Sequence, residues 1–93
     1  MKFVQFHELK LLVESVPASG GLFYVTLDPE NPEKYNLHFY RDACLKTLFR
    51  EKRYTLTTQR GGVKSFSSLD TLCSEVLKLG GFRFTIDLSE EIN

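Results

Sequence analysis

The sequence predicts an α+β fold: a single small domain with an antiparallel-rich sheet of about five strands and two or three helices packed on one face. Three observations predict it. The chain has 93 residues, which suffices for one hydrophobic core, because a chain this short buries only about 60 to 65% of its extended surface. Apolar residues make up 42% of it, with only 6 glycines and 3 prolines, far from a disordered composition. Segments with helical spacing of apolar residues alternate with segments rich in β-branched and aromatic residues.

The first part of the chain predicts a helix followed by a β-hairpin. Phe6, Leu9 and Val13 recur at helical spacing, which favours a helix over about residues 5–15, and a short strand over Lys2–Phe6 is the alternative. Residues 22–28 and 35–41 should form two antiparallel strands joined by the polar loop DPENPEK. The first of these strands is apolar at nearly every position, which suggests that both its faces are covered.

A second helix is expected over about residues 42–51, with Asp42 as its N-cap. Its apolar stripe includes Cys44, and Cys73 falls on the apolar face of the helix predicted further on. Two cysteines so far apart are too few for a zinc site. We therefore expect two reduced, buried thiols that act as small hydrophobic groups, and a disulfide between them is the alternative.

The stretch RYTLTTQRGGVKSFSSLD, residues 53–70, predicts a strand, a glycine turn, a second strand and a helix start. We favour a three-residue turn over residues 60–62 with Gly62 in the left-handed region, because this register pairs Leu56 with Phe66 and keeps them on one face. A two-residue turn at the glycines is the alternative. Ser67 or Ser68 should cap the helix, with Asp70 completing a weak capping box with Ser67.

The rest of the chain predicts a helix and a closing strand. The helix stripe contains Leu69, Leu72, Cys73, Val76 and Gly80, and Gly80 is the expected residue after the C-cap. The sequence FRFTIDL, residues 82–88, alternates cleanly, so Phe82, Phe84, Ile86 and Leu88 should point inward. Residues 88–93 resemble a frayed acidic tail, and residues 1–93 form the single domain.

The predicted core combines the inward positions of these elements. The following residues should be largely buried: Phe23, Val25, Leu37, Phe39, Leu45, Leu48, Leu56, Phe66, Leu69, Leu72, Val76, Phe84 and Ile86.

Motifs for catalysis or cofactor binding are missing from the sequence. There is no HxxxH, CxxC, GxGxxG or Walker loop, so we expect a non-enzymatic protein with no cofactor, no metal and no small-molecule ligand. The longest apolar runs are far below the 18 residues of a membrane span, and the first ten residues do not form an apolar signal stretch. A cytoplasmic protein without membrane attachment is expected.

Charge is distributed unevenly along a chain of zero net charge. Residues 38–64 carry seven basic and two acidic side chains. A segment of this kind is common on a solvated surface, and clustered basic side chains can also neutralise the phosphates of a polyanion. The candidate contact residues for nucleic acid or an acidic partner are Arg53, Arg60, Lys64, Gln59 and Lys52. The isoelectric point of about 6.7 is low for a dedicated nucleic-acid binder.

The preferred functional hypothesis is therefore a small interaction or regulatory domain that acts through protein–protein contacts or self-association. The alternative is a nucleic-acid-binding accessory protein that uses the basic segment 38–64. An open sheet leaves two edges, and an exposed edge is either guarded or used for pairing. We expect the edge strand with basic side chains to be guarded and the other edge to pair with a protein partner or a second copy.

Overall fold

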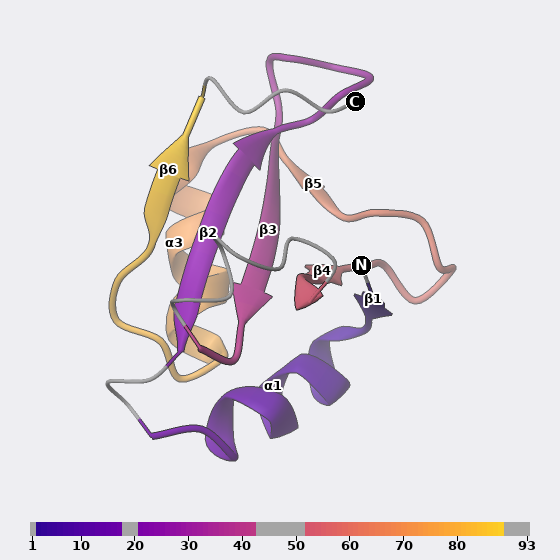
Figure 1. Ribbon diagram of the computed structural model, residues 1–93. Helices are drawn as coiled ribbons and strands as arrows, with labels where there is room; N and C mark the ends of the chain where they lie inside the picture. Colours follow the sequence, from indigo (N-terminus) through magenta and orange to yellow (C-terminus); the bar gives the residue numbers. More distant parts are fainter. Residues whose placement is uncertain (1, 18–20, 43–51, 89–93) are drawn as a thin grey trace.

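The computed structural model describes residues 2–17, 21–42 and 52–88, and its strands form one mixed sheet (Figure 1). Five strands follow the order β1-β4-β3-β2-β6, and a sixth, β5, also pairs with β3. The central pairings of β3 with β2, β4 and β5 are antiparallel, whereas β1 with β4 and β2 with β6 are parallel. The strands are β1 (Lys2–Val4), β2 (Leu22–Leu27), β3 (Tyr35–Tyr40), β4 (Tyr54–Leu56), β5 (Ser65–Phe66) and β6 (Thr85–Asp87).

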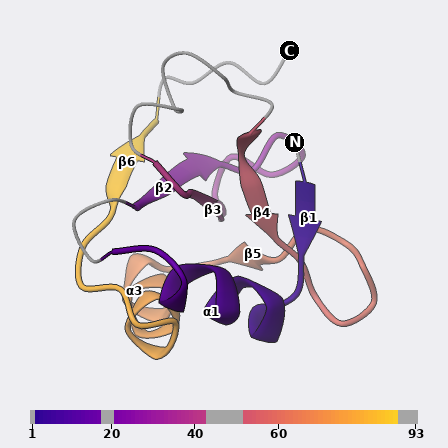
Figure 2. The same ribbon diagram turned by 60° about the horizontal axis from the view of Figure 1, so that its bottom comes forward.

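Two helices, α1 (Phe6–Glu14) and α3 (Leu69–Lys78), lie on the same side of the sheet (Figure 2). The Cα radius of gyration is 12.1 Å, close to the value of about 12 Å expected for one domain of this length. The predicted fold class, a single α+β domain with a mostly antiparallel sheet and helices on one face, is confirmed. Of the helix expected over 42–51 and the tail expected over 88–93, only residues 42 and 88 are described.

The N-terminal segment contains both of the elements that the sequence offered as alternatives. β1 pairs with β4 and ends at Val4, and α1 starts two residues later. Gln5 has an extended backbone and acts as the N-cap, and its N–H donates to the Glu8 carboxylate at 3.0 Å. The change from strand to helix within one residue keeps β1 short and places α1 directly under it.

The hairpin of β2 and β3 forms as predicted, with Val25 opposite Leu37 and Phe23 opposite Phe39. β2 lies between β3 and β6, which explains its apolar sequence: residues 23–26 are buried on both faces. In the loop, the Asp28 carboxylate accepts hydrogen bonds from the N–H groups of Glu30 and Asn31, as in an Asx turn.

The predicted pairing of the stretch 53–66 is wrong, although the predicted faces are right. Thr57 lies opposite Val63, and the residue with positive φ is Gly61, at 93°, rather than Gly62. After this turn the chain leaves β4, and Phe66 pairs with Tyr35 on β3. β4 and β5 therefore pair with β3 one after the other along its length, and residues 57–64 form a loop between them.

Helix α3 starts and stops at residues that the sequence indicated. Ser68 is the N-cap and its hydroxyl accepts from the Thr71 N–H, so the capping box expected between Ser67 and Asp70 is not the one formed. At the other end Gly80 has φ 92°, and the N–H of Gly81 donates to the carbonyl of Val76 in a Schellman arrangement.

The buried stripe of α3 is rotated slightly from the predicted one. Leu72, Val76 and Leu79 are buried, and Glu75 joins them, whereas Cys73 is an exposed free thiol. The prediction of a buried Cys73 is wrong, because the helix presents the side of Leu79 and Glu75 to the sheet. Cys44 lies outside the described residues.

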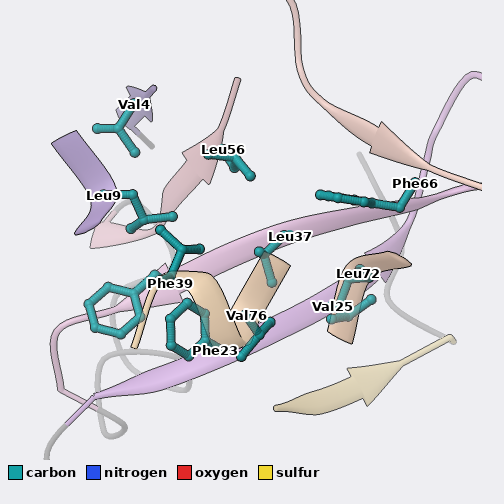
Figure 3. Close-up of a cluster of buried hydrophobic side chains, with 11 residues drawn as sticks. Val4, Leu9, Phe23, Val25, Leu37, Phe39, Leu56, Phe66, Leu72 and Val76 are labelled. Atoms are coloured by element: carbon teal, nitrogen blue, oxygen red, sulfur yellow. The ribbon is translucent and has the colours of Figure 1, made fainter. Parts of the chain in front are cut away.

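The core lies between the sheet and the two helices (Figure 3). Eight predicted core residues are buried there. Leu69 and Phe84 are partly buried, whereas Ile86 is 38% exposed, which contradicts the predicted burial of Ile86. Leu45 and Leu48 are outside the described residues. The eight confirmed core residues are Phe23, Val25, Leu37, Phe39, Leu56, Phe66, Leu72 and Val76.

Candidate interaction surface

An exposed apolar surface follows the β6 edge of the sheet and the adjoining side of α3. Four large apolar side chains form it: Leu77 is 62% exposed, Phe82 66%, Ile86 38% and Leu88 58%. We call these four residues the β6 surface. β6 is the outermost strand on this side, and among the described strands it pairs only with β2 (Figure 1).

Two side chains of the segment 82–88, Phe84 and Ile86, lie on the helix side of the sheet. Ile86 lies opposite Val25, which belongs to the core, so Ile86 points to the side of the sheet that the helices cover. Phe84, two residues earlier, packs against the core and is half-buried. The predicted inward direction is therefore confirmed for Phe84 and Ile86, and among the described strands none lies beyond β6 to cover Ile86.

The surface is hollowed where α3 approaches residues 82–84. Cys73, Val76 and Leu77 of the helix face Phe82 and Phe84 across a shallow groove. A second cavity, of about 220 Å³, is lined by Phe82 together with residues of α1 and β2. Phe82 therefore borders both hollows, and an apolar side chain of a partner has a place to enter in each.

Asp87 lies on the opposite face of β6. Its carboxylate accepts a 2.7 Å hydrogen bond from the Tyr24 hydroxyl, and because Tyr24 is buried this bond fixes the C-terminal end of β6 to the neighbouring strand. Arg83 precedes the strand and is exposed, and its guanidinium lies 5.3 Å from the centre of the Phe82 ring. The β6 edge thus carries apolar groups together with one charge of each sign.

Buried polar side chains of β2, β3 and β4 form a hydrogen-bonded layer. His38 is 4% exposed, and its ring nitrogens lie 2.8 Å from Thr26 Oγ1 and 2.9 Å from Thr55 Oγ1. An imidazole held on both sides by hydroxyl groups is well satisfied inside the protein. This geometry favours a structural role for His38.

Arg53, a predicted contact residue, belongs to this buried layer. Its side chain is 3% exposed, its guanidinium lies over the rings of Tyr24 at 5.2 Å and Tyr40 at 5.6 Å, and its Nε donates to the Tyr40 hydroxyl. Cation–π contacts and hydrogen bonds of this kind stabilise a buried arginine. In this conformation Arg53 is not presented to a partner at the surface.

The other predicted contact residues are dispersed. Lys64 is bonded to Glu75 of α3 at 2.7 Å on the helix side of the sheet, the side opposite to Arg53. Arg60 and Gln59 are exposed in the turn. Gln59 and Lys64 line one hollow beside α1 and α3. Lys52 lines a different hollow, so the structure does not bring the five residues together.

Arg53 directly precedes β4, and β4 lies between β1 and β3, so Arg53 does not guard an edge of the sheet. Among the described strands the edges are β1 and β6. Sequence reasoning also missed the exposure of the β6 surface. Leu77 was the available signal, because it is a leucine outside the apolar stripe of its helix.

The described residues form neither a metal site nor a membrane-spanning helix. Within residues 2–17, 21–42 and 52–88, no group of three or more His, Cys, Asp or Glu side chains could hold a metal ion. No helix in the same part of the chain is long and apolar enough to cross a membrane.

The fold and the surface define a class: a small α+β domain with an exposed apolar edge strand. No protein-family model matches the chain, and comparisons with curated proteins and with solved structures give no match.

Proposed function

We propose that this chain is a non-enzymatic interaction domain that binds protein through the β6 surface. One observation carries the proposal: Phe82, Ile86 and Leu88 are exposed along the segment of the edge strand β6, and exposed Leu77 of α3 lines a groove with Phe82. Single exposed apolar residues are common on proteins, but a contiguous group marks a contact site.

Strand addition is the mode of binding that this surface supports. A partner strand beside β6 would pair with the outward backbone groups of the edge, and its apolar side chains would cover Phe82, Ile86 and Leu88. Complete removal of such a side chain from water contributes roughly 1.5 to 3 kcal/mol. The two hollows that Phe82 lines provide the shape that selects among partners.

Peptide selection tests this proposal with no partner specified in advance. A library of random 12-residue peptides is selected for binding to the immobilised protein at low concentration, and the selected peptides are titrated into ¹⁵N-labelled protein. We expect sequences that alternate apolar and polar residues and that shift the amide resonances of residues 82–88.

A matched pair of variants makes the result specific. Phe82→Ser should weaken peptide binding at least about tenfold, because a ring buried in an interface is a typical hot spot. Leu11→Ser is the control, since Leu11 on α1 is also 66% exposed, and it should change binding less than about twofold. Peptides that shift other resonances, or equal effects of the two variants, would contradict the proposed function.

Nucleic-acid binding is the second candidate, and the arrangement of three cations favours it. Lys2, Arg41 and Lys52 line one hollow near the start of β4, and clustered cations are what a phosphate backbone binds. Fluorescence titration with single-stranded and duplex DNA at 50 and 200 mM salt tests it. This candidate predicts binding that weakens steeply with salt and falls in Lys52→Ala but not in Lys34→Ala; absence of binding at 50 mM salt would reject it.

A further inference from the structure

The sequence of the β6 segment is chemically symmetric about Thr85. Outward from this residue, Phe84 matches Ile86, Arg83 matches Asp87 and Phe82 matches Leu88. Each match joins either two apolar side chains or two opposite charges. A strand with this pattern is complementary to an antiparallel copy of itself.

The face of each side chain agrees with such pairing. In an antiparallel pair, residues directly opposite each other point to the same face of the sheet. Two copies related by a two-fold axis normal to the sheet keep their helix sides on the same side, so apolar residues must meet apolar residues. Ile86 lies on the helix side, opposite the core residue Val25, and Phe84 packs against the core. In the single chain β6 spans only Thr85–Asp87 and the Arg83 guanidinium lies over the Phe82 ring; pairing over residues 82–88 would extend the strand and turn Arg83 to the face of Asp87.

Charge selects one register among those that keep the faces matched. With Thr85 on the axis, Arg83 of each copy lies opposite Asp87 of the other, and two such pairs form. With Phe84 on the axis, Arg83 faces Thr85, and with Ile86 on the axis, Asp87 faces Thr85. Opposite charges directly across a strand pair stabilise it, whereas like charges there destabilise it.

We propose that the partner of the β6 surface is a second copy of this chain, joined by antiparallel pairing of the two β6 segments with Thr85 on the two-fold axis. This inference rests on the proposed function. The two sheets become continuous, both pairs of helices lie on one side, and the apolar residues of the two copies cover one another. A contact made by one short strand and a few side chains is at the small end of interface sizes, so the dimer forms reversibly and depends on concentration.

Disulfide trapping tests the register. In Thr85→Cys the two sulfur atoms face each other across the axis, because opposite residues have Cβ atoms about 4.5 to 5.5 Å apart, close enough for a small adjustment to form the bond. In Arg83→Cys, the control, the two cysteines are displaced by four residues, or about 13 Å, along the strands. Oxidised glutathione accepts the two electrons of each disulfide.

The readout is the linked peptide in mass spectrometry. A disulfide that joins two copies of the peptide with residue 85 comes from two chains, whatever Cys44 and Cys73 do. We expect this peptide from Thr85→Cys and at least about tenfold less self-linked peptide from Arg83→Cys, since the cysteines there lie beyond disulfide reach. Equal linking of both variants, or more linking from Arg83→Cys, would overturn the register.

Sedimentation velocity between 5 and 500 µM tests the charge pairs. Arg83→Glu places Glu opposite Asp87 twice per dimer and should raise the dimer dissociation constant at least about tenfold. Arg60→Glu makes the same change of net charge in the exposed turn and should change it less than about twofold. Equal effects of these variants would overturn the pairing.

These outcomes separate the inference from the proposed function. A wild-type protein that stays monomeric at 500 µM but binds selected peptides at residues 82–88 overturns only the second copy as partner. A monomer that binds no peptide there overturns both. A dimer weakened by Phe82→Ser and trapped through Thr85→Cys supports both.

Discussion

The two edge strands of the sheet have the same length and the same kind of pairing, but the segments that flank them differ. β1 and β6 each have three residues, and each pairs in parallel with an interior strand. At the β1 edge, Val4 is 8% exposed because α1 follows at once and places Leu9 beneath the sheet. At the β6 edge no described helix reaches beyond the strand, and Ile86 is 38% exposed. The segment that flanks an edge strand thus decides whether the edge is closed or open.

The exposed side chains of the two edges also differ. Lys2 on β1 is exposed and lies 5.8 Å from the centre of the Tyr54 ring, which places a positive charge at that edge. A lysine at an edge discourages the approach of another strand. Phe3 is the exception, since it is 59% exposed. At the β6 edge, Phe82, Ile86 and Leu88 are exposed, and Arg83 and Asp87 carry opposite charges.

The largest expected contrast between the edges is one of stability. Leu9→Ala should lower the free energy of unfolding by about 2 to 5 kcal/mol, because Leu9 is 0% exposed in the core and its removal leaves a cavity. Leu77→Ala deletes the same atoms from a side chain that is 62% exposed and should cost less than about 1 kcal/mol. Urea unfolding of the two variants measures the difference, and equal costs would show that the β6 surface is not open.

The next effect concerns the glycine that leads from α3 toward β6. A Cβ at Gly81 would lie 2.8 Å from Val76 Cγ1 and even closer to the ring of Phe23. Gly81→Ala should therefore cost about 1 to 3 kcal/mol through overpacking, and it should also displace Phe82 and reduce peptide binding. Gly62→Ala is the control, because nothing lies within 4 Å of the added Cβ. Thermal unfolding and the peptide titration report the two effects, and a Gly81→Ala protein as stable as Gly62→Ala would contradict this packing.

The smallest expected change in stability is at the closed edge. Lys2→Val removes an exposed charge and should alter the free energy of unfolding by no more than about 0.5 kcal/mol. It should nevertheless open β1 to strand pairing, so that light scattering at 200 µM shows more association than in the wild type. The account of the β1 edge would be wrong if association stayed at the wild-type level.

Local patterns predicted the elements and the faces of this molecule well. The alternation of residues 82–88 correctly placed Ile86 on the core side, and the hydrophobic run of β2 correctly indicated an interior strand. The turn after β4 was predicted less well. The glycine with positive φ is Gly61 rather than Gly62, and β5 pairs with β3 rather than with β4. Such pairings join residues far apart in the sequence, and local periodicity does not contain them.

The candidate site could be predicted only in part, for the same reason. The parallel pairing of β2 with β6 makes β6 an edge, and nothing within residues 82–88 reveals that neighbour. Arg53 shows the reverse case: its charge suggested a surface position, but tyrosines from β2 and β3 enclose it. The symmetric pattern about Thr85 is visible in the sequence alone, yet it acquires meaning only when the strand is known to lie at an edge.

Hydrogen–deuterium exchange at 2 and 200 µM tests most directly that β6, and not β1, is the edge that pairs. Strand pairing gives new hydrogen bonds to outward-facing amides, which then exchange more slowly. We predict that peptides covering residues 82–88 exchange more slowly at the higher concentration, while peptides covering residues 2–9 exchange at the same rate at both. Slower exchange at residues 2–9, or no change at residues 82–88, would contradict the account.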